Sequence, residues 1–132
     1  MKKGIKLTLS DLLKKKEQRD KDRVEFKTVY VKNLGGELEI KKLPLAQFMD
    51  MIGDINDNTG AGESLRIQME LIYACCPLLH NKELQDAYEC IEPTDIVGKV
   101  FDDNISDIMT VIGTIFEFYG MDSGDVIGEL KN

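Results

Sequence analysis

The most regular alternation of apolar and polar positions in the chain lies between residues 104 and 120. Asn104 can act as the N-cap of a helix with Asp107 as its third residue, and Gly120 provides a stop. Between these signals the apolar residues recur three or four positions apart, which places them on one helical face: Ile105, Ile108, Met109, Ile112, Ile115, Phe116 and Tyr119. We therefore expect an amphipathic helix here that forms part of the core.

A different period, of two residues, governs residues 25–43. In the first half, Phe26, Thr28 and Tyr30 alternate with Val29 and Val31, which predicts a strand with apolar side chains to bury on both faces. After the turn-forming sequence LGG, the second half directs Leu38 and Ile40 inward and Glu37, Glu39 and Lys41 outward. The two strands should form a β-hairpin. Because a lone hairpin is marginal in water, we expect it to pack on helices or pair with another chain.

The other segments have helical spacing. We expect a short helix from Ser10 to Gln18, a helix after Pro44, and a central helix capped by Ser64 or Glu63 and stopped by Pro77. Two shorter helices are predicted after the caps Asn81 and Thr94. The helix after Pro44 should face the core with Leu45, Phe48, Met49, Ile52 and Ile55. The predicted fold class is α+β and mostly α-helical, with an N-terminal β-hairpin packed on a bundle of about four to six helices.

Charge divides the chain into an arm and a body. Residues 1–24 hold nine Lys or Arg and four Asp or Glu, a net charge of +5, whereas residues 25–132 carry −12. We expect a basic N-terminal arm with a short helix (1–24) and one globular domain (25–132), made of the hairpin (25–43), a helical part (44–120) and a loose acidic tail (121–132). The acidic body should repel nucleic acid. The arm is interpreted as a solvated helix or flexible lead, as a docking element for an acidic partner, or as the cause of salt-sensitive self-association.

Candidate chemistry is sparse. Asp54, Asn56 and Asn58 resemble the start of a calcium loop, but Thr59 stands where glycine is needed and Leu65 where glutamate belongs. GAGESL lacks the third glycine of a dinucleotide fingerprint. The chain has three cysteines, Cys75, Cys76 and Cys90, without metal-ligand spacing, and one histidine, His80, which we expect to be partly buried or to cap a helix rather than to pair with a thiol. We expect no enzyme activity, no catalytic residue, no cofactor and no metal.

The first twenty residues contain no apolar run of signal-peptide type, and no segment has the length and hydrophobicity of a membrane span. We therefore expect a cytoplasmic protein without a membrane partner.

The order of segments resembles one protein family. The resemblance lies in a basic lead followed by the segments FKTVYVKNLGGELEIKKL, PTDIVGKVF and ISDIMTVIGTIFEFYG. In these segments the chain resembles the XkdN-like phage tail assembly chaperones, which are encoded by contractile-tailed phages, defective prophages and tailocin-type particles. The resemblance implies a helper in the cytoplasm of the bacterial host that holds the tape measure protein, assists assembly of the tail tube protein and leaves before the particle is complete. Two alternatives remain open: a structural tail or connector component of the particle, and an acidic DNA-mimic inhibitor.

The predicted partner-binding residues come from the arm, the hairpin and the helix after Pro44. The arm offers charge, the hairpin offers an edge for strand addition, and methionines suit adaptable grooves, although they can equally fill the core. The residues are Lys14, Lys15, Lys16, Arg19, Tyr30, Val31, Leu38, Ile40, Met49 and Met51.

Overall fold

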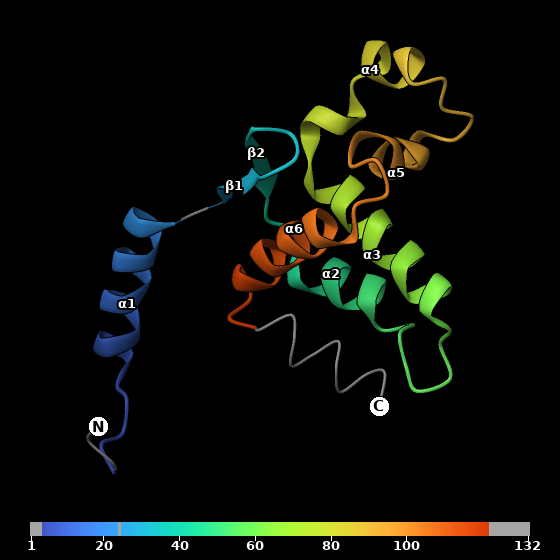
Figure 1. The fold of residues 1–132 in the computed structure, drawn as a ribbon. Coiled ribbons are helices and arrows are strands. Elements are labelled where there is room, and N and C mark those ends of the chain that lie inside the picture. The colour runs from blue at the N-terminus through green and yellow to red at the C-terminus, as the bar shows by residue number, and fades with distance from the viewer. Residues whose placement is uncertain (1–3, 24, 122–132) are drawn as a thin grey trace.

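The computed structural model describes residues 4–23 and 25–121, so that all but the first residue of the predicted loose tail (121–132) lies outside them. Within the described residues, six α-helices and a two-stranded antiparallel sheet confirm the α+β class with an N-terminal hairpin packed on helices. Figure 1 shows one long helix standing to the side of a body in which the hairpin and the remaining helices pack together. The core of the fold therefore belongs to the body.

The separate helix is α1 (Leu9–Asp22), and none of its residues is buried. It begins one residue before the predicted Ser10 and extends four residues beyond Gln18. The cap is Thr8, because its hydroxyl accepts a hydrogen bond from the Asp11 N–H while the Asp11 carboxylate accepts one from the Thr8 N–H. This reciprocal pair fixes the start of a helix that has no packing partner in the described body.

Strands β1 (Phe26–Val31) and β2 (Gly36–Lys41) pair antiparallel, with Phe26 opposite Lys41 and Val31 opposite Gly36. Their inward side chains are Val29, Val31, Leu38 and Ile40. The expectation that β1 buries both faces was wrong, because Phe26 and Tyr30 are exposed on the side away from the helices. The hairpin thus behaves as a sheet with one solvated face.

Helix α6 (Ile105–Glu117) lies against β1 and against α3 (Ala61–Cys75), and its inward face carries the centre of the core. The predicted cap is confirmed, since the Asn104 side chain accepts a hydrogen bond from the Asp107 N–H. Ile108, Val111, Ile112, Ile115 and Phe116 are buried, whereas Ile105 is exposed at the first turn. Gly120 has a φ of +69°, the left-handed conformation that glycine tolerates after a helix end.

Helix α2 (Leu45–Ile52) and helix α3 pack on one another. In α2 only Phe48 and Ile52 of the predicted stripe are buried within the helix, and Ile55 is buried after it ends. Helix α3 begins three residues before Ser64, with Gly60 as N-cap, so the predicted Ser64 or Glu63 cap was wrong. Ser64 instead lies buried inside the helix, where its hydroxyl accepts a hydrogen bond from the Gln68 side chain at 3.0 Å.

Short helices complete the body: η1 (Pro77–His80), α4 (Lys82–Ala87), η2 (Pro93–Asp95) and α5 (Ile96–Val100). Asn81 caps α4 as predicted, accepting from the Leu84 N–H. The Thr94 cap was wrong, because a reciprocal pair between Glu92 and Asp95 holds η2, which leads into α5. Among the described residues, no helix is both long and apolar enough to cross a membrane.

Candidate interaction surfaces

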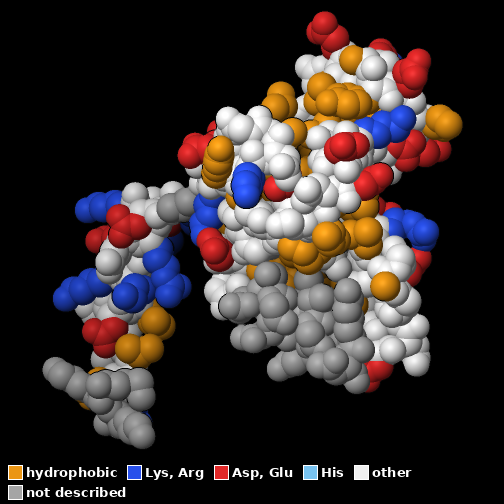
Figure 2. All heavy atoms as spheres, viewed as in Figure 1, with side chains coloured by type: hydrophobic (Ala, Val, Ile, Leu, Met, Phe, Trp, Pro, Cys, Tyr) orange, Lys and Arg blue, Asp and Glu red, His pale blue; other side chains and the backbone are white. Residues whose placement is uncertain are grey.

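The arm presents an apolar stripe to solvent. Leu9, Leu12 and Leu13 occupy one face of the first turns of α1 and are 75%, 55% and 52% exposed. The stripe ends there because Lys14, Lys15 and Lys16 follow directly. Figure 2 shows these hydrophobic side chains near the outer end of the arm, with Lys and Arg side chains grouped beside them. We call Leu9, Leu12 and Leu13 the arm stripe.

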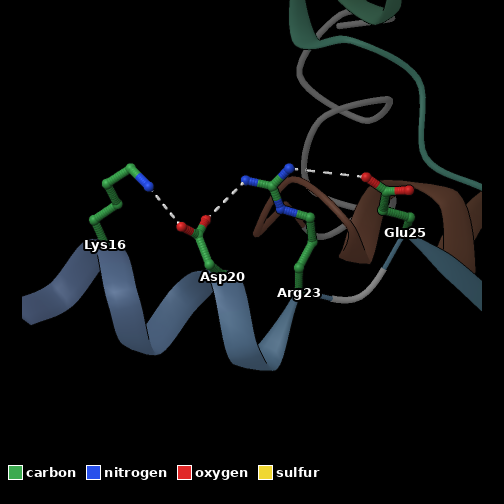
Figure 3. Close-up of polar contacts among 4 residues, drawn as sticks. All are labelled: Lys16, Asp20, Arg23 and Glu25. Carbon is green, nitrogen blue, oxygen red and sulfur yellow. Dashed lines mark hydrogen bonds and ion pairs between the residues drawn. The ribbon is translucent and has the colours of Figure 1, made fainter.

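Beyond Leu13 the same face of α1 carries a row of ion pairs. The Lys16 Nζ lies 2.6 Å from Asp20, whose other carboxylate oxygen lies 3.3 Å from Arg23, and Arg23 lies 3.9 Å from Glu25 at the entry to β1 (Figure 3). All four side chains are exposed, so the pairs contribute little to stability. Of the predicted arm residues, Lys16 is thus engaged within the helix, whereas Lys14, Lys15 and Arg19 make no ion pair within the described residues.

The hairpin residues predicted to bind a partner differ in their solvent accessibility. Tyr30 lies on the solvated face and is accessible. Val31, Leu38 and Ile40 are buried, because the two-residue period of the strands directs them toward α6 and η1. Their side chains stabilise the fold and are covered while the hairpin stays packed, so a contact with a partner at these positions would have to use the backbone edge of the hairpin and stays a prediction.

Helix α2 offers a smaller surface. Met49 is exposed and follows Leu45, also exposed, by one helical turn. Met51 is only half-buried and packs against the core beside Ile52. The two predicted methionines therefore have different environments, one in solvent and one at the edge of the core.

A surface that was not predicted from the sequence lies between α3, the end of α4, and α5. It is a groove of about 850 Å³ with an apolar floor of Leu65, Met69 and Tyr88. The acids on its rim are Glu70, Asp95, Asp102 and Asp103. We call it the α3–α5 groove. Its detection needed the fold, because its walls come from residues that are separated along the chain by more than thirty positions.

The end of α5 shapes one rim of the α3–α5 groove. A Cβ at Gly98 would lie 3.1 Å from the Met69 Cε and 3.2 Å from the Asp103 Oδ1, so the absent side chain allows both groups to come close. Asp102 and Asp103 have φ values of 51° and 56°, a left-handed conformation that Asp tolerates better than most residues. They form the turn between α5 and Asn104, the N-cap of α6, and both line the groove.

The thiols and the imidazole do not form a reactive pair. Cys75 and Cys76 are buried, and burial raises the pKa of the Cys75 thiol to about 12. His80 is exposed rather than partly buried, but it contacts a carbonyl in the last turn of α3, which agrees with the alternative prediction that it caps a helix. Its ring stacks on Tyr73 with centroids 4.3 Å apart, and its Nε2 lies 2.6 Å from the Tyr73 carbonyl oxygen. Among residues 4–23 and 25–121, no group of three or more His, Cys, Asp or Glu side chains could hold a metal ion.

Comparison with known proteins adds no family to this picture. No protein-family model, no curated protein and no solved structure matches the chain.

Proposed function

We propose that the protein is a non-enzymatic phage tail assembly chaperone that binds the tape measure protein and assists assembly of the tail tube in the cytoplasm of the bacterial host. The observation that carries the proposal is helix α1, a capped helix with no buried residue and three exposed leucines on one face. Such a helix has no evident stabilising role in the body. Its apolar face suits the stripe of another helix.

The chemistry of the arm fits a long helical client. A tape measure protein that has not yet been assembled exposes apolar helical stripes, which pair favourably with Leu9, Leu12 and Leu13. Lys14, Lys15 and Arg19 have no ion pair within the described residues, and Lys15 and Arg19 can contact acidic positions beside the stripe. Binding of this kind covers the client without a deep pocket, and it is reversible, as a helper that leaves the particle requires.

Co-expression with the tape measure protein tests the proposal. We expect the two chains to co-elute in size-exclusion chromatography. A Leu12→Ser/Leu13→Ser double variant should lose at least about tenfold in affinity, because two apolar contacts are removed. A Leu34→Ser/Leu78→Ser variant, which changes two leucines of the body that are 43% and 59% exposed, is the matched control and should bind as the unmodified chain does.

A protein inventory of purified particles completes the test. We expect the chain to be absent from finished particles. Its presence at fixed stoichiometry would make it a structural tail or connector component and would refute a transient role. Absence of co-elution would refute the proposal that the tape measure protein is the binding partner.

A further inference from the structure

We propose that helix α1 of one copy docks in the α3–α5 groove of a second copy, so that two chains exchange arms. The inference concerns this chain alone and does not depend on the proposed function. It follows from two surfaces that are both unoccupied within the described residues of a single copy and that have complementary shape and charge.

The α3–α5 groove has the properties of a helix-binding site with a preference for bases. Its floor is apolar, and its rim holds four acids against two bases, Arg66 and Lys99. Both bases already have partners: Arg66 pairs with Glu63, and the Lys99 Nζ donates a hydrogen bond to the Tyr88 carbonyl oxygen at 2.9 Å. By contrast, Glu70, Asp102 and Asp103 make no ion pair within the described residues. With four acids against two bases, the rim carries a net charge of −2.

Helix α1 has the complementary pattern. The arm stripe spans its first two turns and forms one exposed apolar face. On a helix with 3.6 residues per turn, Lys15 and Arg19 follow the stripe on one side, and Lys14 lies further round on the other. With the leucines on the apolar floor, Lys15 and Arg19 lie on the flank that can meet the acids of the rim, Glu70 from α3 and Asp102 and Asp103 from the end of α5, whereas Lys14 lies nearly opposite the stripe.

The positions of the two surfaces favour exchange between copies. In Figure 1 the hairpin and α6 lie between α1 and α5, so the arm is on the opposite side of the body from its own groove. Only residues 23–25 link α1 to β1, a span of about 10 Å when fully extended. The helix would have to wrap around the body to reach its own groove, whereas the groove of another copy is freely accessible.

Exchange of arms is reciprocal in a two-fold dimer. Each copy then gives one helix and receives one, so that both arm stripes are covered in a single closed assembly. The two contacts form together and reinforce one another, because the second docking becomes intramolecular once the first has formed. The free protein would in this way cover the leucines that α1 exposes in a single copy.

Sedimentation equilibrium of the purified full chain over a range of concentrations tests the dimer. We expect a monomer–dimer equilibrium that weakens as salt is raised, because exposed charges contribute to it. In the Leu12→Ser/Leu13→Ser variant the dimer Kd should rise at least about tenfold, whereas the Leu34→Ser/Leu78→Ser control should leave it unchanged. A chain that stays monomeric at all concentrations would overturn the proposal.

The groove is tested by Asp102→Asn/Asp103→Asn. Asparagine tolerates the left-handed conformation of both positions, so folding is preserved while two negative charges are removed. The Kd should rise about three- to tenfold, and its salt dependence should become weaker. The control is Asp54→Asn/Asp57→Asn, which removes the same charge at exposed positions outside the groove. A dimer that responds equally to both pairs, or to neither, would overturn the assignment of the groove.

A mixing experiment separates exchange from docking within one chain. The Leu12→Ser/Leu13→Ser chain has an intact groove, and the Asp102→Asn/Asp103→Asn chain has an intact arm. A mixture of the two therefore retains one intact arm and one intact groove, on different copies. We expect this mixture to form heterodimers, whereas a chain carrying both pairs of substitutions should remain monomeric over the same concentrations. Failure of the mixture to associate would show that arm and groove do not meet between copies.

Discussion

Helices α1 and α6 start almost identically and end in different environments. Their first five residues are LSDLL and ISDIM, and in each the preceding residue, Thr8 or Asn104, accepts a hydrogen bond from the N–H of the third residue, Asp11 or Asp107. Yet α1 buries none of its residues, whereas α6 buries six. The shared cap therefore determines where each helix begins and does not determine whether it packs.

The difference arises after the fifth residue. In α6 the apolar positions continue for two further turns, so that the helix covers α3 and β1. In α1 three lysines follow Leu13, and ion pairs replace leucines on the same face (Figure 3). The length of the apolar stripe thus separates a core helix from an exposed one.

The largest expected effect comes from shortening the stripe of α6. Phe116 is buried and packs edge-on against Phe48 with ring centroids 5.3 Å apart. Phe116→Ala should lower the free energy of unfolding by about 3–5 kcal/mol, since it removes a buried aromatic ring and leaves a cavity. Urea unfolding followed by circular dichroism measures this change.

The matched substitution in α1 is Leu13→Ala. Because Leu13 has no buried contact in a single copy, it should change the free energy of unfolding by less than about 0.5 kcal/mol at concentrations where the protein is monomeric. A loss of similar size to that of Phe116→Ala would mean that α1 packs on its own body and would remove the contrast between the two helices.

A second effect concerns the aspartate that is the third residue of each helix. Asp107 is buried and accepts a hydrogen bond from the Asn33 side chain of the hairpin turn at 2.9 Å, whereas Asp11 is exposed and bonds only Thr8 within the described residues. Asn33→Ala should cost about 1–3 kcal/mol, because it leaves a buried carboxylate without this donor.

The neighbouring substitution Lys32→Ala controls for changes to the turn, since Lys32 is exposed. Equal urea midpoints for the Asn33 variant and the unmodified chain would show that water replaces the amide. In that case the hairpin and α6 would be held together by apolar packing and by the exposed ion pair between Lys27 and Glu117.

The caps themselves give a third and smaller effect. Asn104→Ala should lower global stability by about 1 kcal/mol, because α6 unfolds only with the whole body. Thr8→Ala should leave the urea midpoint unchanged and increase hydrogen exchange at the amides of α1. Protection of those amides in the variant equal to that in the unmodified chain would indicate that a contact other than the cap holds the helix.

The same contrast explains how much of the fold was predictable from the sequence. Patterns local to one element were interpreted correctly: the caps at Asn104 and Asn81, the inward pair Leu38 and Ile40, and the hairpin itself. They succeed because a cap or a two-residue period depends on neighbours in the chain. The same logic failed at Ser64, which resembles a cap but is buried inside α3 with Gln68.

Surfaces were less predictable, because accessibility depends on which elements meet. Val31 and Met49 were both predicted to bind a partner. Val31 is buried because α6 packs against β1, whereas nothing in the described body covers Met49. The α3–α5 groove combines α3 with residues that follow α4, and the only local signal for it was Gly98 before two aspartates. Tyr119 is a similar case: its hydroxyl bonds the backbone of Leu43, 76 residues away.

The smallest effect is a dependence of α1 on pH. Hydrogen bonds from the Thr8 backbone and side chain lower the pKa of Asp11 from its usual 3.8. Because the folded-state pKa is depressed, the stabilisation of the helix start is complete above the unfolded value and is lost as pH falls through the folded value. We expect the carbon chemical shifts of Leu12 and Leu13 to move toward coil values as the pH falls into the acid range below 3.8.

Asp11→Asn is the control for this titration. It keeps an oxygen that can accept from the Thr8 N–H but has no proton to gain, so the shifts of Leu12 and Leu13 should no longer follow pH over this range. If the variant responds to pH as the unmodified chain does, the acid sensitivity does not come from Asp11. The cap that α1 shares with α6 would then not be its cause.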